Sequence, residues 1–175
     1  MQGAGKEEAT LAQLVEQRFC KAKVPGSNPG GGSSDIIRIM ILQVGVKIFL
    51  KNPDGRYLLI RRSQKKYPGV KGEWDIPGGR INPGSLLIEN LRREVREETQ
   101  LEITSEPKLI YAQDIIPNEE KHVVRLSYVG ETKGEPILDT SENIAYQWLS
   151  LEELQKHENV DIYIKEILER GYLVS

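Results

Sequence analysis

The sequence predicts an α/β fold in which a mixed β-sheet lies between helices. Strand-like segments occur on both sides of one helix-like segment at residues 86–99, and two more helix-like segments close the chain. Strands and helices in this order bury their apolar faces best as packed layers. The 175 residues, of which 38% are hydrophobic, suffice for one ordinary domain and an additional segment.

The additional segment is predicted at the N-terminus. Residues 1–38 differ in composition from the rest of the chain and include a run rich in Gly, Pro and Ser. We therefore expect a flexible or disordered tail, followed by a folded domain at residues 39–175. Apolar residues at helical spacing near residues 11–19 would form a helix too short to be stable alone, although a partner or a membrane surface could stabilise it.

Two short sequences in the tail, at residues 11–16 and 24–29, resemble the conceptual translation of a transfer-RNA gene. We therefore expect that the tail is not part of the native gene product and that the native protein starts at Met40.

The domain is predicted to begin with a β-hairpin. Residues 36–50 are rich in β-branched residues, residues 52–55 form a turn sequence, and residues 56–62 return as a second strand. A basic loop at residues 63–72, which contains Gly and Pro, then leads into a glycine-rich turn.

The helix predicted at residues 86–99 carries a row of carboxylates. Ser85 is a suitable N-cap, and no Gly or Pro interrupts the segment. At about 100° per residue, Glu94, Glu97 and Glu98 fall within about a third of the helix circumference, beside the apolar stripe.

Crowded carboxylates of this kind favour a metal ion. Like charges repel on one helical edge, and hard divalent cations such as Mg²⁺ take oxygen ligands. Arg93 lies four residues before Glu97 and can hold its carboxylate in place. The preceding Gly78-Gly79 turn lets the backbone approach a ligand closely and can supply a carbonyl oxygen. The alternative is an ordinary solvated charged helix face.

The remaining segments complete the predicted sheet and its second helical layer. Strands are expected at residues 101–116, 122–131 and 144–149, with turns at residues 117–121 and 133–136. Ser150 and Glu153 form a capping box that opens a short helix, and residues 160–170 form a last helix that ends at Gly171.

The segment from Pro77 to Leu101 resembles the Nudix box. That pattern reads Gly, five residues, Glu, seven residues, then Arg-Glu-apolar-x-Glu-Glu-x-Gly-apolar. Gly79 opens the pattern, residues 93–98 fill its centre, and Leu101 closes it. Two positions depart from the family, because Ser85 replaces its first Glu and Gln100 replaces its Gly.

The resemblance implies a Nudix-type α/β/α sandwich and a metal-dependent hydrolase that cuts a phosphoanhydride of a nucleoside diphosphate derivative. It implies Mg²⁺ as the cofactor, with Mn²⁺ as an alternative. The implied catalytic and metal-binding residues are Gly79, Arg93, Glu94, Glu97 and Glu98, with Glu94 as a third ligand or the general base. The missing carboxylate at Ser85 would weaken metal affinity or rate.

Five residues outside the central motif are candidates for substrate binding. The cations Arg61, Arg62 and Lys66 could meet substrate phosphates. Trp74 could line the pocket, although a packing role is the alternative. Glu142 occupies the loop in which many relatives carry a base or ligand, and a solvated loop residue is the alternative.

The sequence leaves the substrate class open. A MutT-like activity on (d)NTPs, including oxidised nucleotides, fits the compact size, whereas Pro117 stands at a spacing that resembles ADP-ribose hydrolases. A third interpretation is a nucleotide-binding module with weak catalysis, which Ser85 and Ala145 favour and the three glutamates disfavour. An isopentenyl isomerase is excluded because residues 40–175 contain no cysteine.

Composition excludes several other classes of protein. A net charge of −2 argues against a protein that mainly grips nucleic acid or an anionic membrane. No apolar run reaches about 18 residues, and no secretory signal pattern is present. The single cysteine, Cys20, cannot form an internal disulfide, which suits a cytoplasmic protein. We expect a monomer or homodimer that acts on a small nucleotide.

Overall fold

The computed structural model describes residues 40–66, 68 and 73–173, so the expectations for the tail lie outside the described residues. The described residues belong to a compact unit that spans Arg38–Ser175. Its strands are β1 (Ile41–Lys51), β2 (Tyr57–Arg62), β3 (Trp74–Asp75), β4 (Gly78–Arg80), β5 (Lys108–Asn118), β6 (Lys121–Glu131) and β7 (Asn143–Leu149). Its helices are α2 (Leu87–Thr99), α3 (Leu151–Lys156) and α4 (Ile162–Glu169).

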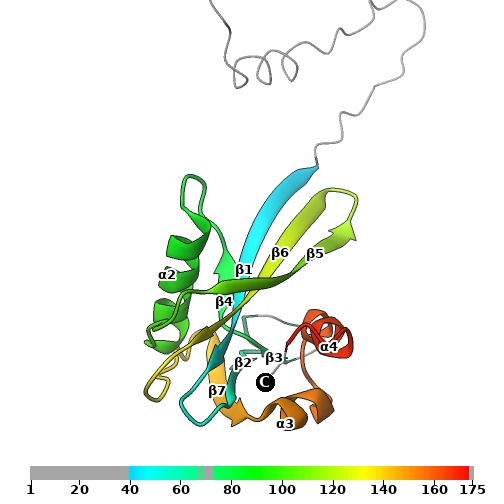
Figure 1. Cartoon of the computed structure of the whole chain (residues 1–175). Coiled ribbons are helices and arrows are strands. Elements are labelled where there is room, and N and C mark those ends of the chain that lie inside the picture. The colour runs from blue at the N-terminus through cyan, green and yellow to red at the C-terminus, as the bar shows by residue number, and fades with distance from the viewer. Residues whose placement is uncertain (1–39, 67, 69–72, 174–175) are drawn as a thin grey trace, which may run out of the picture. The chain divides into compact units, whose positions relative to one another are not determined.

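The described strands form one seven-stranded mixed sheet. Five of them follow the order β3-β2-β1-β6-β5, while β4 pairs with β1 and β7 pairs with β2 (Figure 1). The sheet is mixed because β1 runs parallel to β6 and antiparallel to β2 and β4. The predicted α/β fold with a mixed sheet is confirmed.

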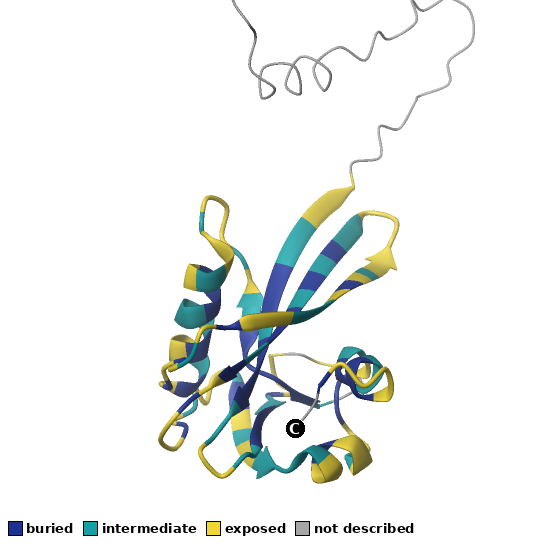
Figure 2. Cartoon of the chain, viewed as in Figure 1, coloured by how far each residue is buried: buried dark blue, intermediate teal, exposed yellow. Residues whose placement is uncertain are grey.

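Alternating side chains of the central strands build two hydrophobic layers, one on each face of the sheet. In β1, Ile48 and Leu50 pack with Leu91 and Val95 of α2, whereas Phe49 packs in the cluster that contains α3 and α4 residues. Figure 2 shows the deepest burial in the strand segments between these helices. The period-2 pattern of a strand thus places one helical layer on each side.

Among the described residues, no helix combines the length and the apolar character required to cross a bilayer. The strand predicted at residues 101–116 begins later than expected, because β5 starts at Lys108. Leu101 and Ile103 are buried in the cluster beneath α2, and this packing accounts for their strand-like alternation. The regular pairing with β6 begins only at Lys108, opposite Val129.

The predicted turn at residues 117–121 is also shorter in the structure. Strand β5 continues through Pro117, and only Glu119 and Glu120 form the turn. The ladder between β5 and β6 is irregular between Ile115 and Asn118. Since β5 is an edge strand of the ordered path, an irregularity there accommodates a proline without a backbone N–H.

The expected N-cap at Ser85 is wrong by one residue. The N-cap of α2 is Leu86, which has an extended backbone and provides no side-chain cap. The Asn90 side chain instead fixes the entering loop, because its Oδ1 accepts the Asn82 N–H at 3.1 Å and its Nδ2 donates to the Arg80 carbonyl at 3.2 Å. The buried Asn90 amide therefore orders the loop before α2, and no side chain caps the first N–H groups of the helix.

The two C-terminal helices begin with well-formed caps. The predicted capping box is confirmed, since Ser150 and Glu153 exchange both hydrogen bonds at the start of α3. Helix α4 starts later than predicted, at Ile162, because Asp161 is its N-cap and accepts the Tyr163 N–H at 3.0 Å. This cap places the Asp161 carboxylate beside the central sheet.

Helix α2 ends at a strained residue. Gln100 adopts the left-handed conformation, with φ of 56° and ψ of 13°, and is the only non-glycine residue of the described part with positive φ. Its N–H donates to the Arg96 carbonyl at 2.9 Å, so the conformation closes the helix.

Replacing Gln100 by Gly is expected to stabilise the fold. Glycine adopts the left-handed region without the steric penalty of a side chain, which is about 1 kcal/mol. We expect Gln100→Gly to raise the free energy of unfolding by about 0.5–1 kcal/mol in urea titrations. A Gln100→Ala variant keeps the strain and should not be stabilised, and a gain in it equal to that of the glycine variant would contradict the explanation.

Candidate active site

The carboxylate-bearing helix α2 and the glycine-rich turn meet at a cavity of about 790 Å³. Side chains from the central strands, the β5–β6 hairpin and the start of α4 form the rest of its lining. A second cavity of about 460 Å³ is lined by residues 154–169 of α3, α4 and their connection. The larger cavity is the candidate site because the motif residues Gly78, Gly79, Glu94 and Glu98 line it.

The glycine-rich turn is held tightly between β1 and α2. A side chain at Gly78 would collide with the Val46 carbonyl, and one at Gly79 would collide with the Glu94 carboxylate. The Gly78 N–H donates to Glu98 Oε2 at 2.7 Å. Gly78 is therefore required by the close approach of the Val46 backbone, whereas a side chain at Gly79 would displace the Glu94 carboxylate from the turn.

Arg93 connects two of the three motif glutamates. Its guanidinium forms ion pairs with Glu94 and with Glu97, the latter in the expected i, i+4 relation. The Glu94 side chain is 17% exposed and lines the cavity, whereas the Glu97 side chain is 58% exposed and lies outside the lining. The structure thus brings Glu94 and Glu98 to the cavity and leaves Glu97 beside them on the helix surface.

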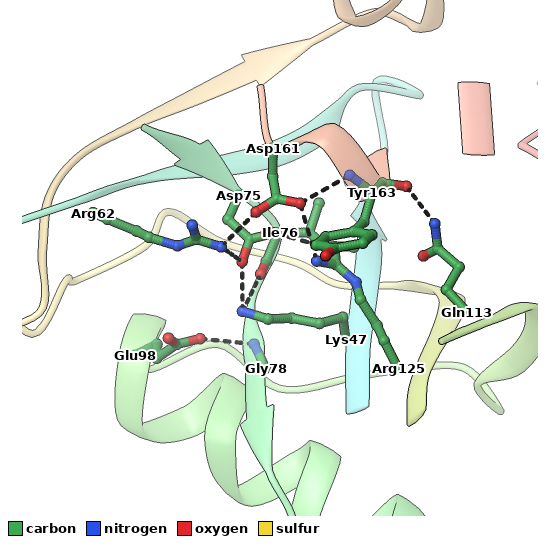
Figure 3. Close-up of polar contacts among 10 residues, drawn as sticks. All are labelled: Lys47, Arg62, Asp75, Ile76, Gly78, Glu98, Gln113, Arg125, Asp161 and Tyr163. Atoms are coloured by element: carbon green, nitrogen blue, oxygen red, sulfur yellow. Dashed lines mark hydrogen bonds and ion pairs between the residues drawn. The ribbon is translucent and has the colours of Figure 1, made fainter. Parts of the chain in front are cut away.

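A network of largely buried charges lines the cavity beside Glu98. Asp75 and Asp161 lie among the cations Lys47, Arg62 and Arg125, which come from three different strands (Figure 3). Lys47 Nζ lies 2.8 Å from Asp75 Oδ2 and also donates to the Ile76 carbonyl at 3.0 Å. Arg125 lies 3.2 Å from Asp75 and 3.3 Å from Asp161. The network fixes the start of the glycine-rich turn.

The two buried carboxylates of the site differ in their pKa. Burial alone would raise the pKa of Asp75, but the charges of Lys47, Arg125 and Arg62 outweigh it and hold this pKa well below its ordinary range. For Glu98, burial is decisive and raises the pKa, against the opposing effects of the Lys47 charge and the Gly78 N–H. Asp75 therefore holds its negative charge more strongly than Glu98 does.

The donor atoms at the glycine-rich end fit a hard divalent cation. Glu94 and Glu98 supply carboxylate oxygens, the Gly78-Gly79 backbone approaches both, and the described residues that line the cavity include no sulfur or imidazole. The described residues include no group of three or more His, Cys, Asp or Glu side chains placed to hold a metal ion. A cation would therefore rely on the two lining carboxylates together with backbone, water or substrate oxygens.

The residues expected to bind substrate separate into two groups. Arg62 and Glu142 line the cavity, whereas Arg61, Lys66 and Trp74 do not. Arg61 pairs with Glu73 at 2.7 Å, and Lys66 pairs with Glu142.

Trp74 is 8% exposed and packs edge-on against His157 in the hydrophobic cluster. In the structure Trp74 therefore lies in the hydrophobic core, which agrees with the packing role that was the alternative to lining the pocket. Ser85, where the motif lacks its first glutamate, also lies outside the cavity lining.

Sequence reasoning missed most of the cationic wall. Lys47, Asp75 and Arg125 are far apart in the sequence, and each lies within a strand where a charged residue predicts a solvent-facing position. Arg80 directly follows the two glycines and was also missed. The only available signal was the occurrence of charged residues inside otherwise apolar strands.

Comparisons with known proteins agree with this geometry. The sequence model of the NUDIX domain matches residues 41–170. The chain is 33% identical over 101 residues to the 8-oxo-dGDP phosphatase NUDT18 of Homo sapiens, a match that covers 57% of this chain and 30% of that protein. It is 31% identical over 111 residues to the nucleoside triphosphatase NudI of Escherichia coli O17:K52:H18, a match that covers 58% of this chain and 77% of that protein.

Solved structures show the same arrangement of sheet and helices. The MutT protein of Methanosarcina mazei Go1 aligns with a TM-score of 0.64 and 30% identity, covering 75% of this chain and 93% of that one. A MutT NUDIX hydrolase from Burkholderia pseudomallei aligns with a TM-score of 0.63 and 25% identity, covering 75% and 98%. The alignments thus cover nearly the whole length of these two small proteins but less than a third of the length of the human relative.

Proposed function

The chain belongs to the Nudix hydrolase family, and on that premise we propose that it is a metal-dependent pyrophosphohydrolase of nucleoside triphosphates. Enzymes of this family act on acid anhydrides in phosphorus-containing substrates. The names of two similar proteins, a nucleoside triphosphatase and an 8-oxo-dGDP phosphatase, support a nucleotide substrate, with oxidised deoxynucleotides included. The folded domain proposed to carry the activity is residues 39–175.

One observation carries the proposal. Two carboxylates, Glu94 and Glu98, meet the Gly78-Gly79 backbone in a cavity that is also lined by the cations of the buried network. A phosphoanhydride needs both environments, because its cleavage requires an activated water and the neutralisation of negative charge on several phosphate oxygens. A solvated charged helix face would provide neither the enclosed oxygen donors nor the cations.

Each residue at the glycine-rich end of the cavity has a proposed role in the reaction. Glu94, Glu98 and the Gly79 carbonyl are the proposed ligands, and Mg²⁺ or Mn²⁺ would supply charge neutralisation and an acidified water when bound. The Gly78 N–H orients the Glu98 carboxylate, and Arg93 orients Glu94. Glu97 remains a proposed ligand, and Arg93 forms ion pairs with both Glu97 and Glu94.

The general base has two candidates. Glu94 lies in the motif itself, whereas Glu142 reaches the cavity from the loop before β7 and forms an ion pair with Lys66. A base must lie within hydrogen-bond reach of the attacking water. Glu94→Gln and Glu142→Gln distinguish the two candidates. The variant that lacks the general base should have a lower kcat, and its pH–rate profile should lose the ionisation of that base.

The proposed activity is tested with a nucleotide panel. The purified chain is incubated with canonical (d)NTPs, 8-oxo-dGTP, 8-oxo-dGDP and ADP-ribose, each with Mg²⁺ or Mn²⁺, and products are separated by ion-exchange chromatography. We expect release of a nucleoside monophosphate from triphosphates, and complete loss of turnover when EDTA removes the metal. A metal-independent rate would contradict the proposed role of the carboxylates.

A second candidate substrate is ADP-ribose or another nucleotide sugar. Pro117, whose spacing suggested this class, lines the cavity at the irregular end of β5. Cleavage of ADP-ribose without cleavage of any triphosphate would establish this class instead. Tight nucleotide binding without turnover of any compound would establish a binding module.

A further inference from the structure

The second cavity, of about 460 Å³, is formed by α3, α4 and the segment that connects them. It shares no lining residue with the candidate active site. Its apolar part consists of Leu154, Val160 and Leu168, which are 0%, 2% and 8% exposed and belong to the hydrophobic cluster on this face of the sheet. A cavity of this volume with an apolar floor is large enough for a small organic molecule.

Lys165 brings an unpaired positive charge to the second cavity. Its ammonium group donates to the Glu158 backbone carbonyl at 2.6 Å. Within the part of the chain that the structure describes, Lys165 forms no ion pair, whereas Lys156, the other lysine of the lining, pairs with Glu152 at 2.6 Å. The carbonyl therefore fixes the position of the Lys165 ammonium, and the charge remains available to a bound anion.

His157 provides a second polar group beside this lysine. Its Nδ1 is buried without a hydrogen-bond partner among the described residues, and its ring packs edge-on against Trp74. Burial, together with the charge of Lys165, lowers the pKa of His157, so the imidazole is mainly neutral at pH 7. A neutral imidazole can carry its proton on Nδ1, and a buried N–H without an acceptor is costly. One anionic acceptor would satisfy both the ammonium and this ring nitrogen.

The other charges of the lining favour a ligand with a single negative charge. Glu158 and Glu169 also line the cavity, so its two lysines and two glutamates give a formal net charge of zero. A dianion such as a phosphate monoester would meet both glutamates with only one unpaired cation to oppose them. A carboxylate carries one charge and accepts hydrogen bonds at two oxygens, which matches one ammonium and one imidazole N–H.

We propose that the second cavity binds a small organic carboxylate with an apolar body. The carboxylate accepts hydrogen bonds from Lys165 Nζ and His157 Nδ1, and the apolar body lies on the floor formed by the three buried side chains of α3, α4 and their connection. This binding site is separate from the proposed hydrolysis, because it uses no residue of the candidate active site and needs neither a metal ion nor a nucleotide.

Nuclear magnetic resonance of the full chain in EDTA tests this site, because the sequence contains only two histidines. Phenylacetate is the probe, and phenylacetamide is the neutral compound with the same apolar body. We expect phenylacetate to bind with a Kd of about 1 mM or lower and to raise the pKa of His157, since a bound anion favours the imidazolium. His122, which pairs with Asp114 at 2.7 Å on the β5–β6 hairpin, should titrate unchanged. A His122→Gln variant assigns the two sets of ring signals.

Three variants test the role of the lysine. Lys165→Met removes the charge but keeps an unbranched side chain, so it should weaken phenylacetate binding by about tenfold or more, which is the loss of one charge-assisted hydrogen bond. Lys165→Arg should retain most of the affinity because it keeps the charge and the donors. Lys108→Met removes an exposed lysine of β5 that lines neither cavity, and it should bind like the unmodified chain. Thermal unfolding shows that each variant is folded.

Several results would overturn the proposal. The absence of saturable binding at about 10 mM phenylacetate would show that the cavity is not a carboxylate site. Equal binding of phenylacetamide, or an unchanged affinity in Lys165→Met, would show that the charge is not recognised. Tighter binding of phenyl phosphate would refute the single negative charge of the ligand, and a change of the His122 signals without one of His157 would place the probe elsewhere.

Discussion

Glu98→Gln is expected to lower kcat by at least about a hundredfold in saturating Mg²⁺, with the fold retained. The variant keeps the shape and the acceptor for the Gly78 N–H but removes the charge of a buried carboxylate beside the glycine-rich turn. Loss of even an outer partner of a metal costs about 10–100-fold in affinity or activity, and a direct ligand costs more. Steady-state kinetics on the best substrate of the nucleotide panel measure the change.

The effect of Mg²⁺ on the thermal midpoint of unfolding provides a second measurement that does not depend on catalysis. On the proposed function, Mg²⁺ would bind only the folded state through these carboxylates, so we expect it to raise the thermal midpoint of the unmodified chain and to raise it much less in Glu98→Gln. Glu89→Gln, an exposed glutamate in the first turn of the same helix, is the matched control and should behave like the unmodified chain. An unchanged kcat in Glu98→Gln would refute the assignment of this carboxylate.

Asp75→Asn is expected to lower the free energy of unfolding at pH 7 by about 3–5 kcal/mol. The carboxylate is fully buried and is shared by Lys47, Arg62 and Arg125, so its neutralisation removes the ion-pair partner of Lys47 and leaves Asp161 to pair with both Arg62 and Arg125. Removing one partner of a buried ionic network costs this much because the remaining charges stay desolvated. Urea unfolding followed by circular dichroism measures the difference.

The pH dependence of this loss has a definite sign. The pKa of Asp75 is well below its ordinary value in the folded chain, so the carboxylate stabilises the fold fully above its unfolded pKa of about 3.9. That stability is lost as the pH falls through the folded pKa. The gap between the unmodified chain and Asp75→Asn should therefore be constant at neutral pH and close below about pH 4.

An exposed aspartate provides the control for this second prediction. Asp54 lies in the turn between β1 and β2 and is exposed, so Asp54→Asn should change stability by less than about 0.5 kcal/mol. A loss in Asp75→Asn as small as that of Asp54→Asn would show that the network contributes little. A loss that persists unchanged at about pH 3 would contradict the low pKa.

Local chemistry explains which elements were predictable. The capping box at Ser150 and Glu153 and the Arg93–Glu97 pair both depend on residues within four positions of each other. Their geometry follows from backbone sterics and helix periodicity, which the sequence displays directly. The N-cap prediction at Ser85 was wrong by one residue, and the loop before α2 is instead fixed by hydrogen bonds from Asn90 to Asn82 and Arg80, which the sequence does not display.

By itself, the sequence determined the α/β class, the family and the carboxylate row of α2, because each is encoded in periodicity or in one contiguous motif. Only the tertiary structure decided which cations meet the cavity. Arg61 pairs with Glu73 and Lys66 with Glu142, and neither cation lines the cavity, whereas Arg80 and Arg125 are brought to opposite sides of Gly45 by the pairing of β4, β1 and β6. Strand order and register set such neighbours, and these depend on hydrogen bonds between segments far apart in the chain.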